Sequence, residues 1–207
     1  MRVLSILVAS ILLTMFGIGI GVASAAPLEA SRALLAGLRS KGRAEATLRY
    51  TLEGVPGEPG RPIRGTLALE PPDRARLDVA TTGETIAVRA DGGDWLDPAA
   101  GQLVRLSPAR VAPALRWWRV LLGGGGEVRE RRDSPGRWWL ILPARAGVPA
   151  DSALVQLDAQ GLPARLDLPS GDGPALYRLS SWRFLAAKGA SAFTLKAPPG
   201  VVEVRLP

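Results

Sequence analysis

The fold is decided by residues 61–106, RPIRGTLALEPPDRARLDVATTGETIAVRADGGDWLDPAAGQLVRL. Within this segment apolar side chains alternate with polar ones, and turn-forming residues interrupt the alternation at Pro71-Pro72-Asp73, Thr82-Gly83 and Asp91-Gly92-Gly93. Proline has no N–H to donate to a strand ladder, and glycine and aspartate favour turns. The pattern therefore predicts a meander of short antiparallel strands with one apolar face and one face in contact with water.

Further strands are predicted on both sides of this meander. Before it, residues 44–52 alternate, with Tyr50 among the apolar positions and Arg49 among the polar ones. The segment 127–132 has a single apolar residue, which indicates either two wet faces or a sheet edge protected by charge. The remaining predicted strands are residues 137–142, 153–158, 162–168, 175–184, 192–195 and 201–204.

Two helices are predicted in addition to the strands. Residues 28–39 place their leucines on one stripe and their charged side chains elsewhere. A second helix is predicted after Ser107, which is a suitable N-cap, and it ends at the glycine run 123–126. Its helical spacing gathers large apolar side chains on one face: Trp117, Trp118 and Leu121. Such a helix either covers one open end of the sheet or forms a movable lid on a glycine hinge.

Composition limits the chemistry that the chain can perform. Its 207 residues are enough for one or at most two domains with a sizeable core. The absence of Cys and His excludes thiol and imidazole chemistry, disulfides and the usual zinc ligands. The net charge is +7, but the arginines are spread along the predicted strands without stacking aromatic residues among them. Nucleic acid is therefore not an expected partner.

The N-terminus has the pattern of an export signal. Arg2 is followed by a mostly apolar run at residues 3–22 and by Ala23-Ser24-Ala25, a small-residue cleavage pattern. We predict a signal peptide at residues 1–25, cleaved after Ala25, and a single domain at residues 26–207 that functions in the periplasm. The alternative is an uncleaved anchor, because about twenty apolar residues can span a bilayer.

The order of three motifs along the chain carries a family resemblance. The first is Gly65-Thr66-Leu67-Ala68-Leu69 followed by the Pro71-Pro72 corner, and the second is Asp91-Gly92-Gly93-Asp94-Trp95. The third combines Phe193-Thr194-Leu195 with Pro198-Pro199-Gly200-Val201. With a signal peptide and a first helix before them, these motifs resemble those of the periplasmic outer-membrane lipoprotein carriers, the LolA-like family.

The resemblance implies a mainly β fold with a few helices: an incomplete, unclosed antiparallel β-barrel with a helical lid. It also implies a carrier that holds the acyl chains of lipoproteins or lipids in an apolar cavity. The implied partners are an inner-membrane release complex and an outer-membrane acceptor, and the implied state is a monomer without a cofactor. In the carriers, an arginine before the corner proline helps to close the lid, whereas this chain has Pro71 there, with Arg74 and Arg76 nearby.

The predicted ligand surface is the apolar face of the meander together with the second helix. It consists of Leu67, Leu69, Leu77, Val79, Ile86, Val88, Trp95, Trp117, Trp118 and Leu121. The same positions also suit a packed core, which would leave no hollow beside the tryptophans. A regulatory or scaffolding module of the same fold is the second hypothesis. An enzyme is the third and is not expected, although carboxylates are available at Asp73, Asp78, Glu84, Asp91, Asp94 and Asp97.

Overall fold

The computed structural model describes residues 28–52, 61–111, 120–122, 128–144, 150–170 and 173–206. The predicted signal peptide at residues 1–25, Trp117, Trp118 and the glycine run at 123–126 lie outside these ranges. Within them, no helix has both the length and the apolar character needed to cross a membrane.

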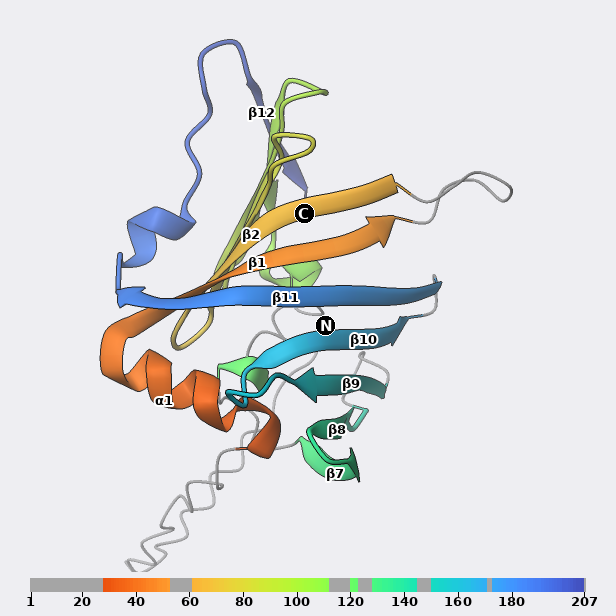
Figure 1. The fold of residues 1–207 in the computed structure, drawn as a ribbon. Helices are drawn as coiled ribbons and strands as arrows, with labels where there is room; N and C mark the ends of the chain where they lie inside the picture. The colour runs from red at the N-terminus through yellow and green to blue at the C-terminus, as the bar shows by residue number, and fades with distance from the viewer. Residues whose placement is uncertain are drawn as a thin grey trace, which may run out of the picture.

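One twelve-stranded sheet forms the frame of the molecule (Figure 1), in the order β12-β6-β5-β4-β3-β2-β1-β11-β10-β9-β8-β7. In the described part of the chain, β12 and β7 each pair on one side only, so the sheet is not closed into a barrel. The predicted fold class, mainly β with an unclosed sheet and few helices, is confirmed. The strands are β1 (Gly42–Leu52), β2 (Arg61–Glu70), β3 (Arg74–Val79), β4 (Thr85–Arg89), β5 (Gly92–Asp97), β6 (Gln102–Leu106), β7 (Arg129–Ser134), β8 (Arg137–Leu142), β9 (Asp151–Leu157), β10 (Pro163–Ser170), β11 (Gly173–Ala186) and β12 (Val202–Leu206).

Two predictions about the C-terminal region were wrong. First, the sheet is not antiparallel throughout, because β12 pairs with β6 in parallel, with Val202 opposite Gln102. The connection at residues 187–201 is long enough to cross the sheet before the chain enters this pairing. Second, residues 192–195 do not form a strand: Ala190–Phe193 is a short 3-10 helix, η2, and the N–H of Leu195 bonds to a side-chain carboxylate, that of Asp94.

The register of the strands defines two faces of the sheet. Leu67 of β2 lies opposite Leu77 of β3, and Leu77 lies opposite Ile86 of β4. One residue further along the same strands, Thr66 lies opposite Asp78. We call the face with the leucines the inner face and the face with Asp78 the outer face. The alternation predicted from sequence is thus the alternation that the sheet uses.

Helix α1 (Arg32–Lys41), which follows the 3-10 helix η1 (Glu29–Ser31), covers part of the inner face. Its buried stripe consists of Leu34, Leu35 and Leu38. The helix ends at Gly42, which has a φ of 96° and donates its N–H to the carbonyl of Leu38. Glycine adopts this left-handed conformation without strain, so it allows the chain to turn directly into β1.

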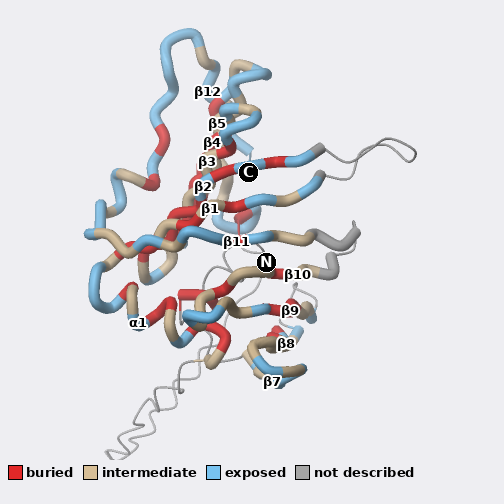
Figure 2. Tube along the Cα trace, in the orientation of Figure 1, coloured by how far each residue is buried: buried red, intermediate tan, exposed pale blue. Residues whose placement is uncertain are grey.

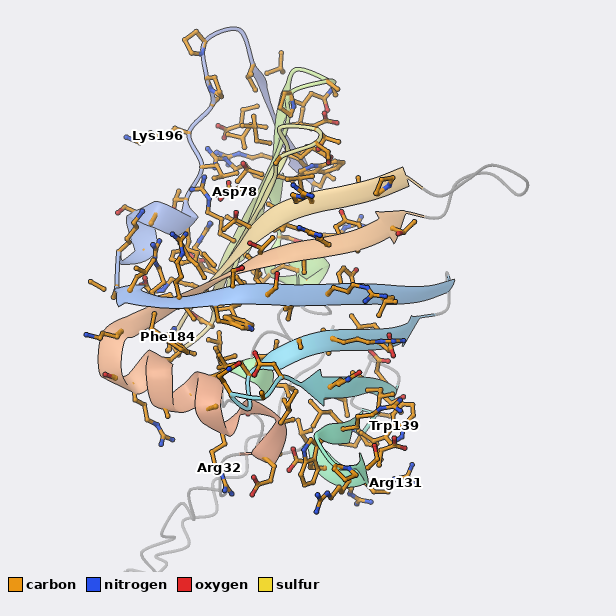
Figure 3. All side chains as sticks on the ribbon, in the orientation of Figure 1. Arg32, Asp78, Arg131, Trp139, Phe184 and Lys196 are labelled. Atoms are coloured by element: carbon orange, nitrogen blue, oxygen red, sulfur yellow. The ribbon has the colours of Figure 1, made fainter. Side chains whose placement is uncertain are left out.

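Gly37 provides a test of how closely α1 sits on the sheet. A Cβ at this position would lie 2.1 Å from Cε1 of Phe184, which Figure 3 shows between β11 and α1. Alanine normally stabilises a helix by about 1 kcal/mol relative to glycine. We nevertheless expect Gly37→Ala to lower the free energy of unfolding by about 1–3 kcal/mol, because either the ring or the helix must move. Urea unfolding measures the change.

The exposed neighbour Ala36 supplies the control on the same helix. Ala36→Gly is expected to lower the free energy of unfolding by about 1 kcal/mol from helix propensity alone. Both substitutions should therefore destabilise the protein. A gain in stability for Gly37→Ala would show that α1 has room to settle away from Phe184.

The outer face of the meander is covered by residues 187–201, which we call the C-terminal strap. In Figure 1 it is the blue segment that runs from the end of β11 to β12. Figure 2 shows its buried positions as short red segments in an otherwise mostly exposed path, and these include Phe193 and Leu195, at 1% and 7% exposure. Glu70, itself buried, accepts the N–H groups of Lys188 and Gly189 at 2.8 and 3.1 Å. The strap is therefore held by backbone hydrogen bonds to outer-face side chains.

Candidate functional site

The predicted ligand residues on the strands all lie on the inner face. Leu67, Leu77, Ile86 and Trp95 form one cross-strand row, and Leu69 and Val88 both lie opposite Ala75 in the next row. Val79 lies opposite Gly65 on the same face. Leu121 belongs to the same apolar cluster as Leu67 and Leu69. Trp117 and Trp118 lie outside the described residues, and the ligand-binding role of the whole set stays a prediction.

Burial divides these residues into two groups. Leu67 and Leu69 are 1% and 0% exposed and pack with the buried stripe of α1. Val79, Val88 and Leu121 are buried as well. By contrast, the large side chains of Leu77, Ile86 and Trp95 are only half-buried. The half-buried group thus lies on the same face as the buried group, beside the part of the sheet that α1 covers.

Aromatic side chains border the half-buried group. The rings of Tyr50 and Tyr177 are 5.3 Å apart between centroids, and both side chains are half-buried on the inner face. The indole N–H of Trp95 donates to a carboxylate oxygen of Glu84 at 3.2 Å. Because Tyr and Trp combine a large apolar surface with a polar tip, they suit the edge of an apolar surface that meets water.

The tyrosines of this border are uncharged at neutral pH. Burial raises the pKa of Tyr50, and the nearby Tyr177 and Glu84 raise it further. Burial also raises the pKa of Tyr177. Sequence reasoning placed Tyr50 on the apolar side of its strand but did not assign either tyrosine to the site. The pairing of β1 with β11, which places Tyr50 opposite Tyr177, has no local signal in the sequence.

A helical cover begins where the sequence predicted it. Residues 108–111 are helical, and the carbonyl of Ser107 accepts the N–H groups of Arg110 and Val111 at 3.1 and 3.3 Å. Val111 packs on the inner face over Gly93, where a Cβ would lie 2.7 Å from Cγ1 of Val111. Close packing at Gly93 therefore positions the start of this segment on the sheet. Whether the segment opens as a lid stays a prediction.

The arginines near the corner at Pro71-Pro72 lie on the outer face. Arg74 donates to the carbonyl of Pro71 at 2.9 Å and forms an ion pair with Glu70. Arg76 pairs with Asp78 at 2.9 Å and donates to the carbonyl of Ala192 in the strap. Both side chains are thus engaged with the corner or the strap, and neither is directed at the inner face.

The acidic residues of the meander have structural partners. Asp94 is 1% exposed and pairs with both Arg89 and Arg105 at 2.9 Å, so its carboxylate is engaged in buried ion pairs. The strap covers it, which no local pattern indicates. Asp97 accepts the N–H groups of Ala99 and Ala100. Among the described residues, no group of three or more acidic side chains is arranged to hold a metal ion.

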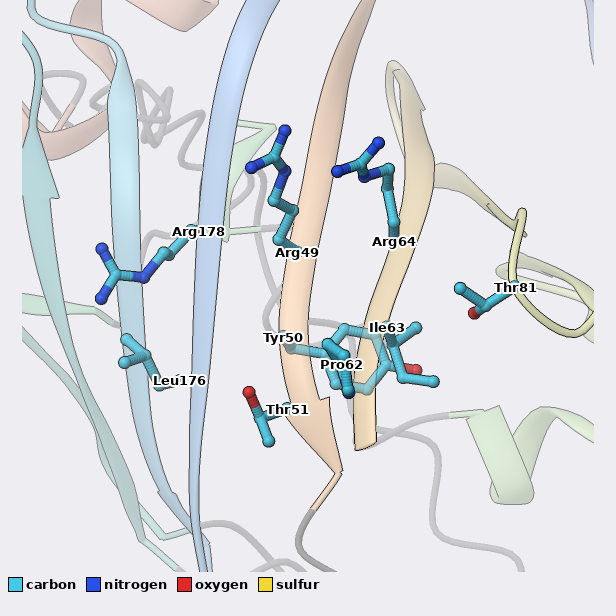
Figure 4. Close-up of a pocket in the computed structure, with 9 residues that line it drawn as sticks. All are labelled: Arg49, Tyr50, Thr51, Pro62, Ile63, Arg64, Thr81, Leu176 and Arg178. Carbon is cyan, nitrogen blue, oxygen red and sulfur yellow. The ribbon is translucent and has the colours of Figure 1, made fainter. Parts of the chain in front are cut away.

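An open hollow of about 620 Å³ lies along neighbouring stretches of β1, β2 and β11 (Figure 4). Tyr50 and Ile63 contribute to it from the inner face. Polar and charged side chains contribute from the outer face, among them Thr51, Arg49, Arg64 and Arg178. The exposed residues of its lining thus make the hollow an open, cationic part of the outer face.

Comparison with known proteins gives similarities of fold. No protein-family model matches the chain, and no curated protein matches it in sequence. Among solved structures, it is similar to an uncharacterized conserved protein from Thermus thermophilus, with 14% identity and a TM-score of 0.49 over 86% of this chain and 100% of that one. It is also similar to a LolA superfamily protein from Nitrosomonas europaea, with 9% identity and a TM-score of 0.44 over 80% and 97% of the two chains.

A third similar structure is the lipoprotein LppX from Mycobacterium tuberculosis, with 15% identity and a TM-score of 0.38 over 74% of this chain and 92% of that one. The similar structures therefore include one named as a LolA superfamily protein, the family that the sequence motifs resemble.

Proposed function

We propose that this protein is a periplasmic carrier that binds the acyl chains of lipoproteins or lipids on its inner face and ferries them towards the outer membrane. The observation that supports the proposal is the row of half-buried Leu77, Ile86 and Trp95, which lies on one face of an unclosed sheet beside the buried Leu67. Their partial exposure leaves apolar surface that an acyl chain would remove from water.

The physical chemistry of such a surface suits reversible binding. Each CH₂ group that leaves water contributes about 0.8 kcal/mol, so an acyl chain can be held without a polar anchor. The polar groups that border the row in the described part of the chain are those of Tyr50, Tyr177 and Glu84. No bond is made or broken in this process, and we propose that the protein is neither an enzyme nor dependent on a cofactor.

The predicted signal peptide and the family resemblance supply the cellular part of the proposal. Export with cleavage after Ala25 places the carrier between two membranes. An inner-membrane release complex would supply the cargo, and an outer-membrane acceptor would receive it. Carriage between the two calls for a protein that acts as a monomer and leaves the acyl chain accessible on one side.

The direct test is native mass spectrometry of the protein purified from the periplasm, with lipid extraction of its co-purifying material. We expect acylated lipoprotein or lipid with the parent protein. Leu77→Glu and Ile86→Glu should each reduce the bound fraction by roughly tenfold or more, because burying a carboxylate beside an acyl chain is costly unless it is paired. Both side chains are half-buried, so the variants should still fold.

Thr66→Glu is the matched control, since Thr66 is exposed on the outer face beside Leu67. It introduces the same charge and should bind cargo as the parent does. Circular dichroism of all variants separates loss of binding from loss of fold. Equal cargo in the parent and both inner-face variants would contradict the proposed surface, and a parent that carries no acyl ligand would favour a regulatory module.

A further inference from the structure

Arginines from strands that are distant in sequence form a row across the outer face. Arg165 of β10 lies opposite Arg178 of β11, Arg178 lies opposite Arg49 of β1, and Arg49 lies opposite Arg64 of β2. Residues directly opposite each other in antiparallel strands have Cβ atoms about 4.5–5.5 Å apart, and like charges in such pairs are destabilising. We call Arg165, Arg178, Arg49 and Arg64 the arginine row. The repulsion between these like charges would be relieved by negative charge close to the row.

The described part of the chain supplies little of that charge. Arg165 pairs with Asp167 at 3.0 Å. For the exposed Arg49, Arg64 and Arg178, no ion pair or hydrogen bond of the side chain is present within the described residues. Figure 4 shows these side chains on neighbouring strands around the open hollow, and the residues that line the hollow include no acidic side chain.

Several other arginines on the same face of the sheet are paired. Arg76 contacts Asp78, Arg105 contacts Asp94 and Glu203, and Arg183 contacts Glu45, each at 2.9 or 3.0 Å. The sheet therefore neutralises its outer-face arginines where the strap or a neighbouring strand supplies a carboxylate. Arg49, Arg64 and Arg178 of the arginine row have no such carboxylate, and they lie on three adjacent strands, β1, β2 and β11.

Apolar and aromatic side chains lie next to the arginine row on the outer face. Leu176 of β11 is half-buried and lies two residues from Arg178. Ile141 of β8 is 37% exposed and lies two residues from the half-buried Trp139, on the same face. Trp139 in turn lies opposite Arg131 of β7, and Figure 3 shows both at the β7 end of the sheet. Arginine and tryptophan beside aliphatic side chains are the combination found where proteins meet the headgroup region of a membrane.

We propose that the outer face of β10, β11, β1 and β2 docks on an anionic membrane surface. The phosphates of acidic lipid headgroups would lie over the unpaired arginines, and Trp139 and its aliphatic neighbours would face the headgroup layer. Arginine suits this contact because its planar guanidinium donates to phosphate oxygens in pairs. The inference concerns a surface apart from the inner face, so it stands whether or not the inner face binds acyl chains.

Vesicle sedimentation tests the docking surface. The purified protein is mixed with vesicles of phosphatidylcholine alone or of an equal mixture of phosphatidylcholine and phosphatidylglycerol. We expect stronger sedimentation with the mixed vesicles, weakened by salt because the attraction is screened. Replacing both Arg49 and Arg64 by glutamine should lower the partition coefficient for mixed vesicles by roughly 30-fold, about fivefold for each arginine.

The control removes the same charge elsewhere, with Arg32→Gln and Arg39→Gln, both at exposed positions of α1. It should lower partitioning by less than about threefold, because those side chains lie outside the row. Removal of like charges should also leave the Arg49→Gln, Arg64→Gln variant as stable as the parent or more so. If both double variants lost vesicle binding equally, binding would depend only on the net charge of the protein, and the proposal would be overturned. Binding of a DNA duplex that depends on the row, without binding of vesicles, would overturn it in favour of nucleic acid.

Discussion

Replacing Asp94 by alanine is expected to lower the free energy of unfolding by about 3–5 kcal/mol, because it removes charge-assisted hydrogen bonds from Arg89 and Arg105 and leaves the buried N–H of Leu195 without its acceptor. The carboxylate is 1% exposed and lies 2.9 Å from Nη1 of both Arg89 and Arg105. It also accepts the N–H of Leu195 at 2.9 Å, which anchors the strap to β5. A loss of this size should lower Tm by roughly 10 °C in a domain of this length, measured by differential scanning calorimetry.

The free energy of unfolding measured as a function of pH is an independent test of the interactions of Asp94. Burial alone would raise the pKa of Asp94, but the N–H of Leu195 and the guanidinium groups of Arg105 and Arg89 outweigh it and hold the pKa below its ordinary value of 3.8. A carboxyl with a lowered folded pKa binds protons more readily in the unfolded chain. Its contribution is therefore complete well above pH 3.8 and is lost as the pH falls through the folded pKa. Asp94→Ala should flatten this part of the stability profile.

Asp91→Ala is the matched control, because Asp91 contacts the same Arg89 but has a side chain that is 80% exposed. Exposed ion pairs contribute about 0–1 kcal/mol, so this variant should change Tm by no more than about 3 °C. Similar losses for Asp91→Ala and Asp94→Ala would show that burial is not the source of the effect. A loss under about 1 kcal/mol for Asp94→Ala would show that the strap is not clamped at this carboxylate.

The inner face was predictable because it depends on local patterns. Strands β2 to β6 follow one another both in the chain and in the sheet, so the alternation around Leu67, Leu77 and Ile86 is sufficient to place those side chains on one face. The turn residues then fix where each strand ends. Inner-face membership of the strand residues therefore follows from sequence, whereas the degree of burial that separates Leu67 from Leu77 depends on where α1 packs.

The outer face was not predictable because its contacts join distant parts of the chain. The arginine row exists only because β11 inserts between β10 and β1, which places Arg178 beside Arg49. In sequence these residues appear as scattered charges, and the same scatter argued against nucleic acid as a partner. The position of the strap could not be predicted for a related reason. Glu70 and Asp94 bind its backbone N–H groups, and every residue except proline has such a group, so the sequence does not mark which ones are bound. The fold class could thus be predicted from the alternation of apolar and polar residues. The contacts of the outer face depend on the order of the strands in the sheet, which the sequence does not show.

Phe193→Ala is expected to lower the free energy of unfolding by about 3–5 kcal/mol, the usual cost of removing a fully buried aromatic ring. Phe193 is 1% exposed, it lies at the end of η2, and the guanidinium of Arg74 stands 5.9 Å from its ring centroid. Its carbonyl also accepts a hydrogen bond from Arg89. Loss of the ring should loosen the strap, so trypsin should cut more rapidly after the exposed Lys196. Urea unfolding and timed proteolysis measure the two effects.

Thr194→Ala, at the exposed next position, is the control and should change the free energy of unfolding by less than about 0.5 kcal/mol. Phe193→Leu should lie between the two, because it retains part of the buried volume. If Phe193→Ala accelerates cleavage after Lys196 without altering global unfolding, the strap opens as a separate unit, and the outer face of β3 to β5 becomes a surface that the protein can expose. If both measurements change together, the strap belongs to the core, and the open parts of the sheet are the inner-face row and the arginine row.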